Sequence, residues 1–361
     1  MLVDLDYFFA QVEAVRNPSI KEKPVVVCVY SGRSEESGAV STANYIARQY
    51  GVKSGMPIFM AKKKLENVGS VFLPVDHKLY DDVSEKIMII LRSYADRFEQ
   101  VGIDEAYLDV SRKAEGNYVK AGELARKIKE ELKAQQGLTC SIGVGPNKLL
   151  AKIAADIQKP DGLTLVKLEQ VASFLSPLPV DHLMGVGRKT EDKMLTLGIK
   201  TIGDLAEYDT QKLINVFGKN LGTYFHNASM GIDNEPVAER SEAESVSRIS
   251  TLKEDTRDLQ TILEKTSQLC DDIHARLMQQ GLRFKSVGIM TVMSDMSIHS
   301  RSRTFENPTN ELGILKKTVE ELFEKLLRDS EFKVRRAGVK ISSFAEGTEK
   351  QQQLTSFMSS A

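Results

Sequence analysis

The order of candidate strands and helices most constrains the fold of this chain, because one arrangement occurs in it twice. Strand patterns and helical spacing alternate over the first half, at residues 1–7, 77–95, 98–101, 106–110, 118–132 and 138–144. Apart from a long insertion after the first strand, this is the order β-α-β-β-α-β. The same order returns over residues 246–342. We therefore expect a multidomain α+β protein with two separate sheets.

The residues between and after the two repeats differ in character. Residues 168–230 are expected to form short helices separated by glycine, and residues 231–245 lack periodicity and are rich in acid. The polar tail from Gly347 is expected to be disordered. At ~150 residues per domain, 361 residues correspond to two or three domains.

Composition excludes several classes of protein. The chain is 41% apolar and 27% charged, has no run of the ~18 apolar residues that a membrane helix needs, and starts with no signal peptide. Its three cysteines, Cys28, Cys140 and Cys270, are far apart, which excludes a disulfide scaffold and a zinc site of the usual spacing and predicts a cytoplasmic location. With 49 Lys and Arg against 50 Asp and Glu, the chain could bind nucleic acid only through a local basic surface.

Two pairs of acids stand at the ends of candidate strands. Asp4 and Asp6 are two residues apart, so both would point to one face of a strand. Asp104 and Glu105 lie in an apolar, β-rich stretch, where buried carboxylates are unfavourable unless a cation or a donor compensates them. Two divalent ions for phosphoryl transfer would need such oxygen ligands. A β-turn between two hairpin strands explains Asp104 and Glu105 at least as well, so spacing alone leaves both interpretations open.

A row of polar residues is a candidate anion site. Thr42, Tyr45 and Arg48 recur every three residues near the start of an expected helix, where two hydroxyls and a guanidinium could face one phosphate. Lys159 lies in a loop just before a turn. Taken singly, these are ordinary solvated side chains, and the anion site requires that they face the acidic residues.

Glycines in two turns could bring backbone amides to phosphate. The sequence LMGVG (residues 183–187) precedes an expected helix, which is the helix-hairpin-helix pattern. Gly185 and Gly187 would let backbone N–H groups approach a DNA phosphate. An ordinary αα-hairpin with glycine caps is the alternative. Lys148 and Lys152, one helical turn apart beside a Gly-rich corner, are further candidate DNA contacts.

Basic residues concentrate in the strands of the second repeat. Residues 241–346 hold 17 Lys and Arg and 17 Asp and Glu, but the acids gather in the expected helices. Strand segments without acid contain Arg301, Arg303, Lys333, Arg335, Arg336 and Lys340. We expect a basic sheet face laid along a phosphate backbone, with the helices turned to solvent, in preference to a mixed solvated surface.

Five segments, in order, resemble motifs of the Y-family (lesion-bypass) DNA polymerases of the DNA polymerase IV type, with an archaeal character. They are VDLDYFFA from Val3, AVSTANYIAR from Ala39, IDEAYLD from Ile103, VGPNKLLAK from Val144 and KPDG from Lys159. The match covers almost the whole chain. One departure is Gly102, which stands where the family more often has serine.

The resemblance implies a βαββαβ palm with small inserted fingers, an all-α helix-hairpin-helix thumb and a C-terminal βαββαβ little finger. The implied bounds are 1–7 and 77–165 for the palm, 8–76 for the fingers, 166–230 for the thumb, 231–245 for a linker, 246–345 for the little finger and 346–361 for a flexible tail. Fingers this short, with small residues over the base pair, imply an open site, weak shape checking and low fidelity.

The resemblance also implies the chemistry of the site. Two Mg²⁺ ions, for which Mn²⁺ is expected to substitute, would be held by Asp4, Asp104, Glu105 and the backbone carbonyl of Leu5. Asp6 would be structural. The triphosphate would be bound by the backbone amides of Tyr7 and Phe8 and by Thr42, Tyr45, Arg48 and Lys159. Phe9 matches the steric gate, the aromatic residue that excludes a ribose 2′-hydroxyl.

The implied function is template-directed addition of deoxynucleotides to a primer 3′-hydroxyl, with bypass of damaged template bases. The expected partners are primer–template DNA and a dNTP, with no membrane, and the protein is expected to be a monomer. The segment QQQLTSFM resembles the sliding-clamp peptide of archaea and eukaryotes, and its contacts would be Gln351, Leu354, Phe357 and Met358.

Two other functions compete with polymerisation. A non-catalytic DNA-binding scaffold could keep the fold, but all three metal-binding carboxylates and Phe9 are present. A nucleotidyl cyclase can share a palm-like unit, but it would need neither a helix-hairpin-helix nor a basic C-terminal sheet. The sequence therefore favours the polymerase.

Overall fold

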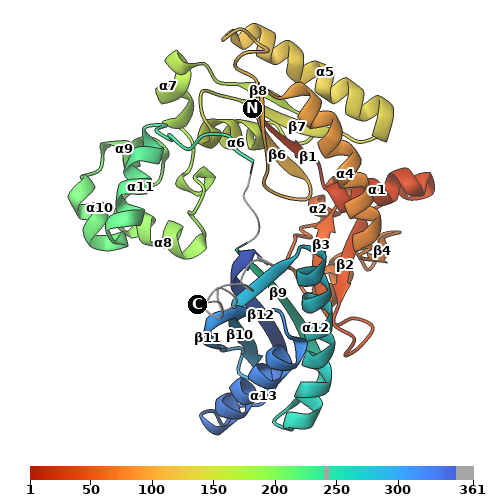
Figure 1. The fold of residues 1–361 in the computed structure, drawn as a ribbon. Helices are drawn as coiled ribbons and strands as arrows, with labels where there is room; N and C mark the ends of the chain where they lie inside the picture. Colours follow the sequence, from red (N-terminus) through yellow and green to blue (C-terminus); the bar gives the residue numbers. More distant parts are fainter. Residues whose placement is uncertain (240–243, 347–361) are drawn as a thin grey trace, which may run out of the picture. The chain divides into compact units, whose positions relative to one another are not determined.

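The computed structural model describes residues 1–239 and 244–346, which fall into two compact units. The first unit comprises residues 1–29 and 40–240, and the second comprises residues 30–39 with the chain from residue 241 onward. Figure 1 follows the chain through both by colour. Among the described residues, no helix is long and apolar enough to span a bilayer.

The centre of the first unit is a five-stranded sheet in the order β5-β6-β1-β7-β8. Its strands are β1 (Leu2–Leu5), β5 (Arg97–Gln100), β6 (Glu105–Asp109), β7 (Cys140–Val144) and β8 (Leu163–Leu165). The central strand β1 is antiparallel to both β6 and β7, and β8 adds in parallel to β7. The predicted order of strands and helices along the chain is confirmed, and β8 is an addition that its short, mixed sequence did not indicate.

Helices cover both faces of this sheet and bury β1 completely. They are α4 (His77–Tyr94), α5 (Tyr118–Gln136) and α6 (Lys148–Ile157). The amphipathic helices α4 and α5 pack on one face. On the other face, alanines of α6 contact Leu2 and Tyr107. The side of the sheet that α6 covers is therefore distinct from the main apolar core.

The inserted segment after β1 contains a small sheet in the order β3-β2-β4. Its elements are α1 (Phe8–Arg16), a 3₁₀ turn (Pro18–Ile20), β2 (Val25–Tyr30), β3 (Gly38–Ala43), α2 (Tyr45–Gln49), α3 (Ile58–Lys64) and β4 (Val71–Pro74). The helix expected near Thr42 begins at Tyr45, because the side chain of Asn44 caps it by accepting from the Ala47 amide at 2.9 Å. Thr42 lies on β3, so Thr42, Tyr45 and Arg48 do not form a row on one helix.

Short helices with their own core follow the sheet, as the glycine spacing predicted. They are a 3₁₀ turn (Leu168–Gln170), α7 (Val171–Leu175), a second 3₁₀ turn (Val180–His182), α8 (Arg188–Thr196), α9 (Ile202–Glu207), α10 (Thr210–Phe217) and α11 (Lys219–Ser229). Met194, Ile202 and Phe225 are fully buried at their centre.

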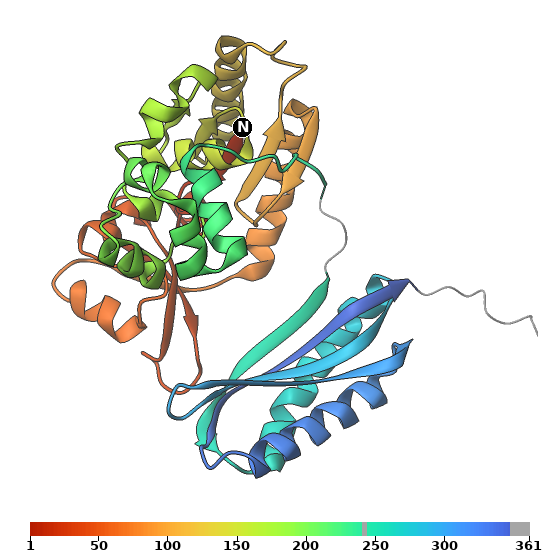
Figure 2. The same cartoon turned by 90° about the vertical axis from the view of Figure 1, so that its left-hand side faces the viewer.

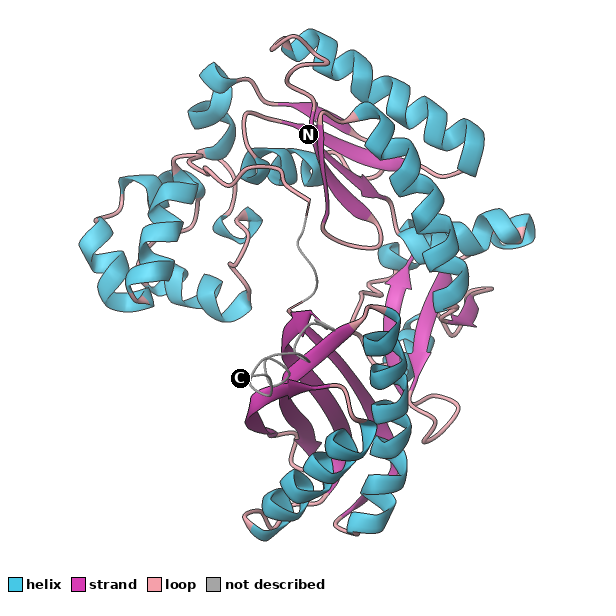
Figure 3. Ribbon diagram, viewed as in Figure 1, coloured by secondary structure: helices cyan, strands magenta, loops and turns pink. Residues whose placement is uncertain are grey.

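The second unit is a four-stranded antiparallel sheet in the order β11-β10-β12-β9 with two helices. Its elements are β9 (Ser245–Thr256), α12 (Leu259–Gln279), β10 (Leu282–Met293), β11 (Ile298–Thr309), α13 (Leu312–Arg328) and β12 (Val334–Glu346). This is the predicted second β-α-β-β-α-β order. Both helices lie on one face of the sheet, and neither covers the other face (Figures 2 and 3).

Candidate active site

The carboxylates at the ends of two neighbouring strands lie on the α6 side of the sheet. Asp4 and Glu105 face each other across the β1–β6 pairing. Because side chains alternate across a strand, both point to the face that carries Leu2 and Tyr107. Asp104 immediately precedes β6, and its carbonyl accepts a hydrogen bond from the Leu5 amide at 2.9 Å. Asp104 and Glu105 thus lie at the turn of the β5–β6 hairpin. The β-turn interpretation and the metal-site interpretation of these two residues are therefore compatible.

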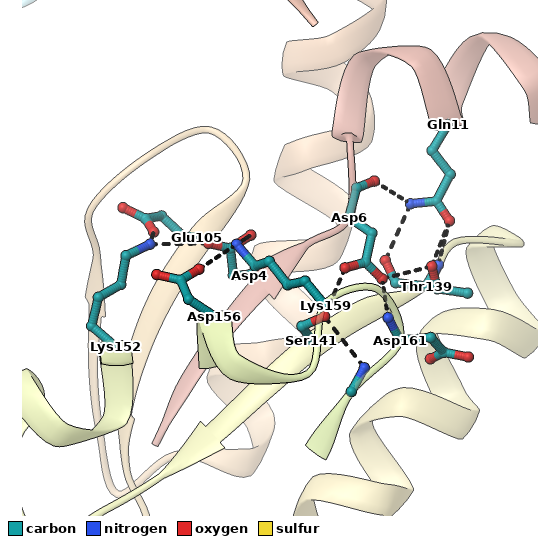
Figure 4. A network of polar contacts seen from close by, with 11 residues as sticks. Asp4, Asp6, Gln11, Glu105, Thr139, Ser141, Lys152, Asp156, Lys159 and Asp161 are labelled. Atoms are coloured by element: carbon teal, nitrogen blue, oxygen red, sulfur yellow. Dashed lines mark hydrogen bonds and ion pairs between the residues drawn. The ribbon is translucent and has the colours of Figure 1, made fainter. Parts of the chain in front are cut away.

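Two lysines neutralise part of this negative charge (Figure 4). The Lys152 ammonium lies 3.0 Å from Asp4 Oδ2 and 2.6 Å from Glu105 Oε2. Lys159 lies 2.8 Å from Asp4 Oδ1 and 2.8 Å from an oxygen of Asp156. Burial disfavours both ammonium charges, but the neighbouring carboxylates outweigh it and raise the pKa of Lys152 and Lys159.

Asp104 keeps an uncompensated share of the charge. Its burial, and then the negative charges of Asp4 and Glu105, raise its pKa above the usual carboxyl range. Within residues 1–239 and 244–346, no three metal-binding side chains converge closely enough to hold an ion in this arrangement. The carboxyl oxygens are nevertheless the hard donors that Mg²⁺ prefers, and their mutual repulsion is what a divalent cation would relieve.

Asp6 lies beyond the end of β1 and has a different environment. The strand ends at Leu5, and Tyr7 adopts a left-handed backbone with φ 36° before α1 begins. Asp6 therefore lies beyond the strand, but its hydrogen bond with Ser141, which pairs with Asp4 in the β1–β7 register, keeps both carboxylates on one side of the sheet. The Asp6 carboxylate is buried and accepts hydrogen bonds from Thr139 Oγ1 at 2.8 Å, Ser141 Oγ at 2.7 Å and the Asp161 amide at 2.9 Å. It joins β1, β7 and the loop after Lys159, which fits the structural role implied for it.

Part of the predicted anion row gathers near Asp4. The ring of Tyr45 meets Tyr7 edge-on at 5.4 Å between centroids, and the Arg48 guanidinium lies 4.8 Å above the Tyr45 ring. Arg48 Nε also donates to the Ala43 carbonyl at 2.8 Å. Burial raises the pKa of the Tyr45 hydroxyl, and Arg48, Asp6, Lys159 and Asp4 are the charges that act on it. Tyr45 therefore lies within electrostatic reach of Asp4 and Lys159, with Arg48 against its ring.

Phe9 rests on a buried aromatic residue that the sequence did not single out. Its ring stacks on Tyr80 with 4.1 Å between centroids and 12° between planes. Tyr80 is fully buried, and its hydroxyl donates to the buried Glu13 carboxylate at 2.8 Å. Phe8, by contrast, is buried in the core. Tyr80 occurs at ordinary helical spacing on α4, so only the fold reveals the stack.

The glycine turn before α8 is open to solvent. Gly185 has φ 82°, a conformation that favours glycine, and Tyr224 closes the turn by donating to the Met184 carbonyl at 2.9 Å. Gly187 precedes α8, and a Cβ placed on it would meet nothing within 4 Å. The first-turn amides of α8 are therefore accessible to an anion.

Both lysines of α6 that were predicted to contact DNA have acidic partners within the first unit. Lys148 is about nine-tenths buried and pairs with Glu99 at 2.9 Å and with Glu235 at 2.9 Å. Lys152 binds Asp4 and Glu105. Their contact with DNA stays a prediction.

The structure corrects the predicted sheet face of two strand arginines in the second unit. Arg301 and Arg303 lie opposite Ile289 and Val287 in the β10–β11 pairing, and these two apolar residues face the helices. Accordingly, Arg301 pairs with Asp329 at 2.6 Å, and Arg303 pairs with Glu321 of α13 at 2.6 Å. We call the face of this sheet that neither helix covers the open face. The prediction that both arginines lie on it is wrong, because side chains alternate along a strand and this register turns both toward the helices.

The open face is richer in hydroxyls than in cations. Arg336 and Lys340 lie on it, opposite Val292 and Gly288 in the strand register. Its hydroxyl residues are Ser245, Ser247, Thr251, Ser286, Ser300, Ser302, Thr304 and Ser342. None of the positions that this register brings to the face is acidic. Arg335 occupies an irregularity in the β12–β9 pairing and lies 3.6 Å from Asp255.

Comparisons with known proteins agree with this architecture. A family described as "impB/mucB/samB family" matches residues 3–156, its C-terminal domain matches residues 243–355, and "DNA polymerase-iota, thumb domain" matches residues 181–233. The chain is 47% identical to DNA polymerase IV of Nitrosopumilus maritimus over 98% of both chains. It is 39% identical to DNA polymerase IV of Saccharolobus solfataricus over 96% of both.

Solved structures give the same result. The Y-family DNA polymerase chimera Dbh-Dpo4(243-245)-Dbh superposes with a TM-score of 0.90 at 38% identity, covering 96% of this chain and 98% of the other. A structure titled "Insertion ternary complex of Dbh DNA polymerase" gives a TM-score of 0.69 at 38% identity, with the same coverage. The chain belongs to the Y family of DNA polymerases, with relatives of the DNA polymerase IV type. The predicted palm, helix-hairpin-helix thumb and little finger architecture is confirmed.

Proposed function

We propose that this protein adds deoxynucleotides to a primer 3′-hydroxyl by two-metal phosphoryl transfer under the direction of a template, with low fidelity and bypass of damaged bases. The observation that carries the proposal is the meeting of Asp4 and Glu105 across two strands, with Asp104 beside them. Lys159 pairs with Asp4, and Tyr45, with Arg48 against its ring, lies within electrostatic reach of both. This combination suits a triphosphate whose reacting phosphorus lies at the acids.

The carboxylates of Asp4, Asp104 and Glu105, with the Leu5 carbonyl, are the groups that would hold two Mg²⁺ ions. When bound, these ions supply the positive charge that lowers the pKa of the 3′-hydroxyl and offsets the charge of the leaving pyrophosphate. Asp4 and Glu105 are already oriented by Lys152, which must release or share their oxygens when a cation binds. Asp6, fixed by its three donors, holds the end of β1 in place.

The chain's own cations and amides would bind the triphosphate. Arg48 and Lys159 bring positive charge, Thr42 and Tyr45 bring hydroxyls, and the amides of Tyr7 and Phe8 lie at the start of α1. Phe9 would lie under the sugar as the steric gate. Its ring is held from behind by Tyr80, so it would resist displacement by a 2′-hydroxyl.

Each unit would contact DNA through its own set of residues. In the first unit, the amides at Gly185 and Gly187 would bind backbone phosphate. In the second unit, Arg336 and Lys340 would contact phosphate, and the surrounding hydroxyls would donate to phosphate oxygens, with Arg335 at the strand irregularity. The sparse cations predict a modest dependence of affinity on salt.

We also propose that the C-terminal segment binds a sliding clamp. Gln351, Leu354, Phe357 and Met358, which carry this prediction, lie outside the described residues. A one-turn helix would place the three apolar residues together as a plug for a hydrophobic pocket.

Primer extension on a defined template tests the central proposal. The wild type should extend a primer with dNTPs and Mg²⁺, and the double variant Asp104→Ala, Glu105→Ala should show no extension while retaining its affinity for primer–template DNA. A wild type that binds DNA without extending it would establish the scaffold alternative. Templates with an abasic site or a bulky adduct, compared with undamaged template, test lesion bypass directly.

A further inference from the structure

Residues 231–239, called the strap below, follow α11 and lie against the first unit. The Asn147 side chain donates to the Gly231 carbonyl at 2.7 Å, and Asp233 Oδ2 accepts from the Leu149 amide at 3.0 Å. Asn147 is also the N-cap of α6 and accepts from the Leu150 amide. The strap therefore completes the N-terminus of α6, where first-turn amides have no partner within the helix.

Lys148 joins the strap to the β5–β6 hairpin. Its ammonium lies 2.9 and 3.1 Å from the two oxygens of Glu99 on β5, and 2.9 Å from Glu235 on the strap. The side chains of Lys148 and Glu99 are only 10% and 7% exposed, so their attraction is weakly screened. The Ala238 amide of the strap also donates to Glu99, at 3.4 Å.

The same hairpin presents the catalytic acids. Glu99 lies opposite Tyr107 in the β5–β6 pairing, and Lys148 lies 5.3 Å from the centre of the Tyr107 ring. Val237 of the strap packs against the cluster that contains Tyr107. Two residues earlier on β6, Glu105 is held by Lys152, which follows Lys148 by one turn of α6. One helix thus contacts the hairpin at two neighbouring points near its turn, and the strap covers the contact at Glu99.

We propose that the strap, acting through Lys148 and Glu99, positions the Asp104–Glu105 hairpin for the reaction. A hairpin of four- and five-residue strands is weakly stable by itself, so its geometry depends on what packs against it. Lys148, Glu99 and the strap acids are therefore positioning residues and not DNA contacts. This also accounts for the acid content of the segment, which DNA contact would not favour. The inference rests on the proposed polymerase function.

The test separates positioning from DNA binding and from stability. The double variant Lys148→Met, Glu99→Gln removes the ion pair without leaving a buried charge unpaired. Its rate of single-turnover incorporation, normalised to active sites by burst titration, should fall about tenfold to a hundredfold, as expected when catalytic groups shift by a fraction of an ångström to an ångström. Hydrogen exchange of the hairpin amides should accelerate. The DNA dissociation constant and its salt dependence should match the wild type and the control Lys133→Met, an exposed lysine on α5.

Each other outcome contradicts the proposal. A fall in the active fraction with an unchanged rate per active site would mean that the ion pair is merely structural. A salt slope reduced by about one unit would make Lys148 a phosphate contact. If the double variant does not fold, the strap variant that combines Asp233→Asn at a half-buried residue with Glu235→Gln at an exposed one should still accelerate hairpin exchange and lower the rate. Lys148→Arg should keep the wild-type hairpin exchange and the wild-type rate. Normal values in the strap variant would refute the proposal. A wild type that fails to incorporate dNTPs refutes the proposed function instead.

Discussion

Replacement of Asp6 by alanine should destabilise the protein while leaving the chemistry largely intact. The buried carboxylate accepts three hydrogen bonds of 2.7 to 2.9 Å, and each hydrogen bond to a charged group contributes about 1.5–3 kcal/mol. The Thr139 hydroxyl keeps an alternative acceptor in Gln11 at 3.1 Å, so the three contributions are not all lost. We expect a loss of about 3 kcal/mol, near the lower end of what removing one partner from a buried charged network costs. For a unit of this size, the Tm should fall by about 6–12 °C.

Scanning calorimetry on the full chain and single-turnover incorporation per active site together test this expectation. Asp6→Asn, which keeps an acceptor oxygen and the side-chain volume, should lose about half as much stability. Asp4→Ala is the matched contrast, because it removes a carboxylate at the reacting atoms and should abolish incorporation. If Asp6→Ala kept the wild-type Tm but lost all incorporation per active site, Asp6 would act in the chemistry and its structural assignment would be wrong.

Three further predictions concern the gate, the acids and the open sheet face. Phe9→Ala should raise ribonucleotide relative to deoxynucleotide incorporation by about tenfold or more, and an unchanged ratio in single-nucleotide assays would remove Phe9 from the gate. Asp104→Asn should raise the Tm although it abolishes incorporation, because burial and two neighbouring carboxylates raise the pKa of Asp104 and its ionised form weakens the folded state. That gain should be present at neutral pH and vanish below the unfolded carboxyl pKa of about 4, where the group is protonated in both states; a gain that persists there contradicts the cause. Lys340→Gln should reduce the slope of log affinity against log salt by about one unit, and an unchanged slope would place Lys340 off the phosphate path.

The sequence was sufficient to predict the order of strands and helices and to single out Asp4, Asp104 and Glu105, which the structure brings together. A carboxylate pair inside an apolar β-rich stretch, such as Asp104 and Glu105, is conspicuous because burial without compensation is unfavourable. The two repeats were readable because helical and strand periods differ, and the family motifs then fixed the architecture. These features depend on neighbours within a few residues, which is the range over which a sequence pattern is informative.

The errors arose where long-range pairing decides the outcome. Arg301 and Arg303 differ from open-face residues only in strand parity, which the register with β10 sets. From the sequence, the Lys148 ammonium appeared to lack an acidic partner, because Glu99 and Glu235 are 49 and 87 residues away along the chain. Thr42, Tyr45 and Arg48 were interpreted as a row at helical spacing because nothing in the residues around Thr42 revealed the pairing of β3 in the small sheet. The Phe9–Tyr80 stack had no local signal for the same reason.

Lys152 on α6 and Lys159 in the loop after it offset part of the negative charge of the acidic site. Three carboxylates at one end of a sheet repel one another, and burial together with this repulsion raises the pKa of Asp104. Lys152 bridges Asp4 and Glu105, so two of the three acids are paired with a cation and oriented. Because Lys148 lies one turn earlier on the same helix, the helix that supplies this charge also anchors the strap. Folding and orientation of the acids therefore depend on one element, and a substitution that tilts α6 should alter both together.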